Sequence, residues 1–138
     1  MDKYQHKIQY YETDKMGITH HSNYIRWFEE ARVDFLERAG FGYDRMESLG
    51  VFSPVLSVRA EYKKMTSFPE TVDIYTSITK FTGVRFCISY VVKNAVGEIC
   101  CVGESEHCFI DSEGKPVRPK NAAPEIYEMM CRLLQKGE

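Results

Sequence analysis

A predicted helix over residues 22–39 carries apolar side chains on too much of its circumference to lie on a protein surface. Ser22 or Asn23 is suited to cap its start, and Gly40 to close its end. Apolar residues recur at helical spacing, and a second apolar face adjoins the first: Tyr24, Trp27, Phe28, Ala31, Phe35 and Ala39, then Ile25, Val33 and Leu36. Other parts of the chain must therefore enclose this helix.

Segments with apolar side chains at every second position indicate strands that can enclose it. The predicted strands cover residues 4–11, 55–65, 71–81, 84–93 and 98–111, with a helical turn over 44–49 and a last helix from Pro124. These strands are longer than the usual 5–6 or so residues, so they can twist around one helix. We predict a single α+β domain, residues 1–138, in which a five-stranded antiparallel sheet wraps the long helix and its last four strands form a meander.

Composition and charge exclude several classes of function. Lys and Arg number 18 against 20 Asp and Glu, which argues against a dedicated nucleic-acid-binding or polybasic membrane-binding protein. No segment approaches the ~20 apolar residues of a membrane span. The five cysteines lack C-x-x-C spacing and no apolar leader is expected, so we predict reduced thiols and a cytoplasmic location.

Residues 11–29, YETDKMGITHHSNYIRWFE, contain the pattern T-D-x-x-G-x-x-x-H-x-x-Y where the long helix begins. This segment resembles the opening signature of the hotdog-fold thioesterases, specifically the 4-hydroxybenzoyl-CoA thioesterase-like family. The likeness extends to residues 61–64, 68–72 and 111–116. One departure is that Met65-Thr66 follows the basic pair, where the family commonly has a proline. The resemblance implies a hotdog fold, hydrolysis of an acyl-CoA or acyl-carrier-protein thioester, and a homodimer or homotetramer with sites built from two chains.

The motif also carries candidate catalytic residues. Thioester hydrolysis needs a nucleophile or base and a group that stabilises charge on the carbonyl oxygen. The resemblance makes Asp14 the catalytic carboxylate, as nucleophile or general base, whereas the structural alternative is an aspartate in an Asx turn. It gives the oxyanion role to the backbone N–H of His21, which suits a helix start. Tyr24 then lines the acyl pocket, packs in the core, or does both.

Four basic residues are candidates for binding the phosphates of coenzyme A. They are expected to gather at one hairpin end of the sheet: Lys63, Lys64, Lys80 and Arg85. Each on its own is typical of solvated surface charge.

The other polar residues are given structural roles. No metal site is expected, because the adjacent His20 and His21 have no nearby partner ligands, and Cys100 and Cys101 point to opposite faces of a strand. No cofactor is expected either, because coenzyme A is part of the substrate. Partly exposed positions are expected for His6, His20 and His107, and solvation or pairing with Arg26 and Arg32 for Glu29 and Glu30.

Two other functions remain open at this point. A hotdog dehydratase or hydratase acting on β-hydroxyacyl thioesters is one, although related enzymes place prolines after the histidine and residues 20–24 contain none. A non-catalytic acyl-carrier-binding module is the other, although it would have no need of Asp14. The acyl group itself, aliphatic or aromatic, cannot be read from the residues.

Overall fold

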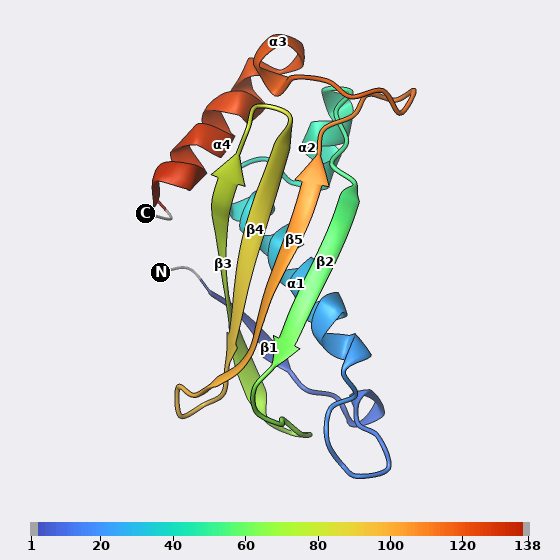
Figure 1. Cartoon of the computed structure of the whole chain (residues 1–138), viewed down its shortest axis with the longest axis vertical. Helices are drawn as coiled ribbons and strands as arrows, with labels where there is room; N and C mark the ends of the chain where they lie inside the picture. The colour runs from blue at the N-terminus through green and yellow to red at the C-terminus, as the bar shows by residue number, and fades with distance from the viewer. Residues whose placement is uncertain (1–2, 137–138) are drawn as a thin grey trace.

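The computed structural model describes residues 3–136 and shows a curved antiparallel sheet lying along one long helix. The strands are β1 (Lys3–Lys7), β2 (Val55–Tyr62), β3 (Thr71–Phe81), β4 (Arg85–Lys93) and β5 (Ile99–Cys108). The helices are η1 (Tyr10–Glu12), α1 (Ser22–Arg38), α2 (Tyr43–Ser48), α3 (Pro119–Ala122) and α4 (Pro124–Lys136). Figure 1 shows α1 passing behind the sheet and α4 beside β3 at the upper end.

The strand order in the sheet is β1-β3-β4-β5-β2, which corrects the predicted meander. The strands β3, β4 and β5 are consecutive neighbours as expected, but β2 pairs with β5 and forms an edge of the sheet. The segment between β2 and β3 crosses to the other edge, where Ile8 N donates to Glu70 O at 2.9 Å. Periodicity fixes which face of a strand is buried but does not name the strand's neighbours, so the sequence pattern could not give this order.

Several element boundaries also differ from the predicted ones. The first strand ends at Lys7 because residues 10–12 turn into η1, where Glu12 accepts a hydrogen bond from Gln9 N at 2.8 Å. The helix α1 begins after His21, whose side chain makes no capping bond, so neither Ser22 nor Asn23 is the cap. The bounds of β3 agree with the prediction, 71–81.

The core lies between α1 and the concave face of the sheet, as the apolar pattern of the helix requires. Alternate residues of β3 and β4 are buried on this face, as predicted: Val72, Ile74, Thr76, Ile78, Phe86, Ile88, Tyr90 and Val92. On α1, Tyr24, Trp27 and Phe28 are buried, whereas Ile25 on the second apolar face is exposed. Within residues 3–136, no helix has both the length and the apolar character needed to cross a membrane.

A buried polar cluster interrupts this core and corrects two expectations. His107 is fully buried rather than partly exposed, and Nη1 of the buried Arg32 lies 3.3 Å from both of its ring nitrogens. Ser105 Oγ is 2.7 Å from His107 Nε2 and 2.7 Å from the hydroxyl of Tyr90. Arg32 therefore faces the sheet, and Glu30 instead accepts a hydrogen bond from Tyr4.

Candidate active site

One open cavity of about 400 Å³ contains five of the seven predicted site residues: Asp14, His21, Tyr24, Lys63 and Lys64. Its other lining residues are Met16, Ile18, Thr19, Tyr62 and Met65. Its lining residues come mainly from the loop before α1 and the segment at the end of β2, and both segments lie at the lower end of the chain in Figure 1. The motif residues and the first two basic residues are thus brought together by the fold.

Asp14 sits in a tight loop that fixes its position. Its N–H donates to Ile18 O and its carbonyl accepts from Gly17 N, both at 2.9 Å, and Gly17 has a φ of +77°. Oδ1 of Asp14 accepts a hydrogen bond from Met16 N at 2.8 Å. This bond forms the Asx turn that is expected if Asp14 has a structural role. Within residues 3–136 no hydrogen bond reaches Oδ2, so the turn and an available carboxylate oxygen coexist.

His21 stands at the first turn of α1 and lines the same cavity. The neighbouring N–H groups of Ser22 and Asn23 both bond to His20, at 3.2 and 3.1 Å. The N–H of His21 has no acceptor among the residues that the structure describes. Because unpaired N–H groups and the helix dipole concentrate positive charge here, this group can stabilise an oxyanion next to Asp14.

Tyr24 belongs both to the core and to the lining of the cavity. Its ring is buried in the core, yet its edge lines the cavity, and its hydroxyl lies 2.8 Å from Thr66 Oγ1. Burial raises the pKa of Tyr24 to about 12, so this hydroxyl is a neutral hydrogen-bond donor near pH 7.

Two lining residues of the cavity, Tyr62 and Thr19, and one residue that does not line it, Thr66, were not predicted as site residues. Tyr62 donates to His21 O at 3.2 Å, and its ring meets the rings of His21 and Tyr24 edge-on. Thr19 and Thr66 bond to each other although 47 residues separate them in the chain. A contact of that range leaves no local signal in the sequence.

Glu12 anchors the loop that contains Asp14 to α1. Its buried carboxylate accepts hydrogen bonds from His6 Nε2 at 2.9 Å and from Trp27 Nε1 at 2.8 Å. Its carbonyl oxygen accepts from His20 N at 2.8 Å and from Asn23 Nδ2 at 2.9 Å. Burial raises the pKa of Glu12, but the hydrogen bonds to its carboxylate outweigh this and lower the pKa overall. The group therefore remains a charged anchor.

The four predicted basic residues do not form one group, which corrects that expectation. The N–H groups of Lys63 and Lys64 both bond to Cys100 O at the start of β5, whereas Arg85 is opposite Cys108 at its end. Eight residues of strand separate these positions by roughly 26 Å. Lys80 lies with Arg85, because the length of β3 carries it to the far end of the sheet.

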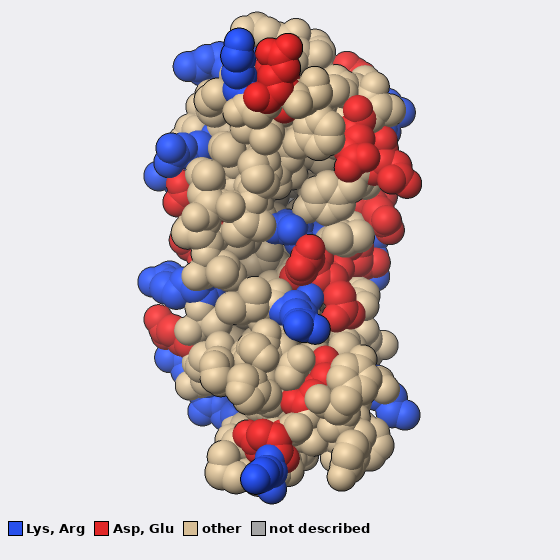
Figure 2. All heavy atoms as spheres, turned by 90° about the vertical axis from the view of Figure 1, so that its right-hand side faces the viewer, with Lys and Arg blue, Asp and Glu red and all other residues tan. Residues whose placement is uncertain are grey.

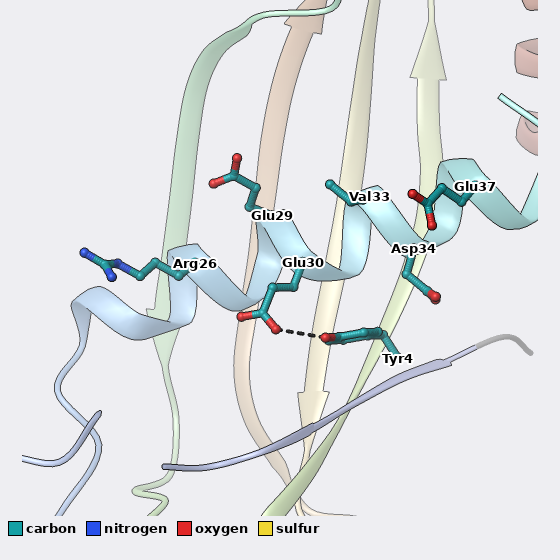
Figure 3. Close-up of a pocket in the computed structure, with 7 residues that line it drawn as sticks. All are labelled: Tyr4, Arg26, Glu29, Glu30, Val33, Asp34 and Glu37. Carbon is teal, nitrogen blue, oxygen red and sulfur yellow. Dashed lines mark hydrogen bonds between the residues drawn. The ribbon is translucent and has the colours of Figure 1, made fainter. Parts of the chain in front are cut away.

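A larger cavity of about 630 Å³ holds none of the predicted site residues (Figure 3). It runs along the outer face of α1, which presents four carboxylates there: Glu29, Glu30, Asp34 and Glu37. Two of the residues that line this cavity form a hydrogen bond that links β1 to α1: the Tyr4 hydroxyl donates to Glu30 at 2.8 Å. None of these four acids lines the cavity that contains Asp14, so the cavity at the helix start remains the candidate for the chemistry.

Comparison with known proteins decides the family. The family model of the thioesterase-like superfamily matches residues 8–134. The chain belongs to this superfamily. It is 35% identical over 126 residues to the Bacillus subtilis protein named "Putative acyl-CoA thioesterase YneP", with 91% of each chain covered. It is 23% identical over 114 residues to the acyl-CoA thioester hydrolase YbgC of Escherichia coli, covering 83% and 84%.

Solved structures agree with this assignment. A DHNA-CoA thioesterase from Staphylococcus aureus superposes with a TM-score of 0.90 at 34% identity, over 99% of this chain and 94% of that one. A protein from Aquifex aeolicus gives a TM-score of 0.86 at 32% identity, over 94% and 99%. The predicted family, the hotdog fold and thioester hydrolysis as the class of reaction are thereby confirmed.

Proposed function

We propose that this thioesterase hydrolyses acyl-CoA thioesters, with Asp14 as the catalytic carboxylate and the His21 N–H as the oxyanion donor. The observation that carries the proposal is that an available carboxylate oxygen and an unpaired helix-start N–H line one open cavity. The names of the relatives YneP and YbgC support the substrate class.

The reaction adds water across the thioester: the carbon–sulfur bond breaks, the acyl carbon gains a hydroxyl group, and the sulfur leaves as a thiol. Asp14 serves it either by attacking the carbonyl carbon and forming a mixed anhydride, which water then opens, or by removing a proton from the attacking water. In both routes the carbonyl oxygen becomes negative opposite the His21 N–H. Coenzyme A enters as part of the substrate, so the proposal requires no cofactor.

An aromatic acyl group is the specific substrate we favour. The rings of His21, Tyr24 and Tyr62 meet at the cavity wall, with centroids 5.3 Å apart for the two tyrosines. The similar structure from S. aureus is a DHNA-CoA thioesterase. Each aromatic contact adds about 0.5–1.5 kcal/mol beyond the area it buries. We therefore expect kcat/KM to be about tenfold higher for benzoyl-CoA or naphthoyl-CoA than for hexanoyl-CoA. Equal or reversed values would contradict the aromatic preference.

Lys63 and Lys64 are proposed to bind the nucleotide end of coenzyme A. Both line the cavity with exposed side chains, and they pair with Glu61 and Glu98. Removing either charge is expected to raise KM for acyl-CoA about 3–10-fold and leave kcat unchanged, because remote phosphate contacts are equal in the ground and transition states. The effect should weaken with salt.

Two comparisons check this role of the lysines. KM for an acyl-pantetheine, which lacks the nucleotide, should not respond to Lys63→Ala or Lys64→Ala. Lys80→Ala removes the same charge at the far end of the sheet and is the matched control. If acyl-CoA and acyl-pantetheine respond alike, the two lysines are ordinary surface charge. A thioester of acyl-carrier protein, the alternative carrier, would be hydrolysed without any nucleotide contact.

We further propose a homodimer formed by pairing of β2 with the β2 of a second copy. The strand β2 is an edge strand, and Val55, Leu56 and Val58 on it are 40–48% exposed. Figure 2 faces this edge and shows a broad uncharged area left of its centre. Two-fold antiparallel pairing would bring Tyr62 of one protomer beside the start of the partner's β2, so each cavity would adjoin both chains.

Light scattering tests the dimer. The expected mass is roughly twice 16.0 kDa, or four times that mass if dimers pair into a tetramer. Val58→Lys should shift it to about 16 kDa, because charged side chains block edge-to-edge pairing. Thr71→Lys, on a strand inside the sheet, is the control. A wild-type mass of about 16 kDa at micromolar concentration would exclude the dimer.

The cytoplasm is the proposed location. All five cysteines are free thiols in the structure, which is typical of proteins kept in a reducing compartment.

A further inference from the structure

We propose that Thr66 is a positioning residue, whose hydroxyl joins the Asp14 loop to the first turn of α1. It would keep the catalytic carboxylate and the oxyanion donor at a fixed separation. This inference rests on the proposed function of the cavity.

The hydroxyl of Thr66 is the centre of a three-residue hydrogen-bond network. Thr66 Oγ1 lies 2.8 Å from the hydroxyl of Tyr24 and 2.8 Å from Thr19 Oγ1. The three residues belong to different parts of the chain: the catalytic loop, the helix α1 and the crossing segment after β2. All three are buried, with exposed fractions of 2–7%, so water does not compete for these bonds.

The protons in this network have one arrangement that uses every hydroxyl as a donor. Thr19 Oγ1 donates to the carbonyl oxygen of Thr66 at 3.1 Å, which uses its only proton. Thr66 must then donate to Thr19, and Tyr24 must donate to Thr66. Tyr24 keeps its proton because burial raises its pKa to about 12. The network is therefore fully satisfied, and loss of Thr66 Oγ1 would leave the buried Tyr24 hydroxyl without an acceptor.

Both ends of the network lead to the groups proposed to do chemistry. Thr19 forms a bridge with Thr13, the residue before Asp14, and its N–H donates to Thr66 O at 2.8 Å. At the other end, Tyr24 N lies 3.3 Å from His21 O in the first turn. Thr66 does not line the cavity, whereas Thr19 and Tyr24 do. Thr66 thus acts through its two partners and not on the substrate.

The test is the kinetics of Thr66→Val, which keeps the volume of the side chain and removes the hydroxyl. Because a misplacement of about 1 Å can cost up to ~10²-fold in rate, kcat should fall about 10–100-fold while KM stays within about threefold. Thr66→Ser, which retains the hydroxyl, should restore kcat to within about threefold of wild type. Thr79→Val, at an exposed position toward the far end of β3, is the matched control.

A double-mutant cycle with Tyr24→Phe separates positioning from general loss of stability. If the two hydroxyls act as one unit, the double variant should be no slower than the slower single variant. All rates are measured well below the melting temperature of each variant, and Tyr24→Phe tests the same bond if Thr66→Val does not fold. An unchanged kcat in Thr66→Val, no rescue by serine, or additive losses would each overturn the inference. An inactive wild-type protein would contradict the proposed function instead.

Discussion

Asp14→Asn is expected to lower kcat for acyl-CoA hydrolysis by about 10²–10⁴-fold while the protein keeps its fold. An asparagine side chain still offers an oxygen to Met16 N, the bond that Oδ1 makes at 2.8 Å, so the turn should persist. The amide can neither attack a carbonyl carbon nor remove a proton from water. Steady-state release of free thiol, measured alongside the melting temperature, gives both quantities.

The chain offers an unusually close control for this substitution. Asp111 begins a loop with the same geometry: Asp111 N donates to Lys115 O at 2.9 Å, and its Oδ1 accepts from Glu113 N at 2.8 Å. Gly114 occupies the place of Gly17, with a φ of +81° against +77°. Asp111→Asn therefore makes the same chemical change in the same turn, away from the cavity, and should leave kcat unchanged. A kcat within about threefold of wild type in Asp14→Asn would remove Asp14 from the mechanism.

Lowering the pH from about 6.5 to 4 is expected to reduce the free energy of unfolding through His107. Burial, together with the neighbouring Arg32 charge, lowers the pKa of His107 from 6.5 to about 4. In this interval the unfolded chain binds a proton at His107 and the folded chain does not. The contribution of His107 to the free energy of unfolding is therefore fully present above pH 6.5 and is lost as the pH falls towards 4. At 1.36 kcal/mol for each pH unit, the loss is about 3 kcal/mol.

Denaturant unfolding of wild type and His107→Gln across this pH range isolates the contribution. Glutamine does not titrate and can still bond to Ser105, whose Oγ lies 2.7 Å from His107 Nε2. The variant is expected to have a flatter dependence of unfolding free energy on pH, whatever its stability at pH 7. Parallel curves for the two proteins would show that His107 titrates alike when folded and unfolded.

The local features of this molecule could be predicted from its sequence. The apolar pattern of residues 22–39 predicted the long helix and its buried face, although the structure leaves the opposite face exposed and does not enclose the helix on all sides. The loop motif brought Asp14, His21 and Tyr24 together near the helix start, where all three line one cavity. Alternation predicted the buried faces of β3 and β4. Each of these features depends on residues close together in the chain.

The features that depend on distant pairing could not be predicted. The placement of β2 at the sheet edge follows from a crossing segment, and alternation is equally compatible with a meander. The separation of Lys63 from Arg85 follows from strand length and direction. The burial of His107 depends on Arg32, 75 residues away, and the role of Thr66 on Thr19, 47 residues away. Arginine and threonine side chains are usually exposed in proteins, so residue type alone does not predict the buried positions of Arg32, Thr19 and Thr66.

Simultaneous measurement of thiol and free acid produced by the wild-type protein from benzoyl-CoA tests the central claim most directly. The account predicts one thiol and one acid for each thioester consumed, at a rate that Asp14→Asn lowers about 10²–10⁴-fold and Asp111→Asn leaves unchanged. A β-hydroxyacyl-CoA should likewise release thiol. Loss of water from that substrate without thiol release, as in a dehydratase, or no turnover of any acyl-CoA, as in a binding module, would contradict it.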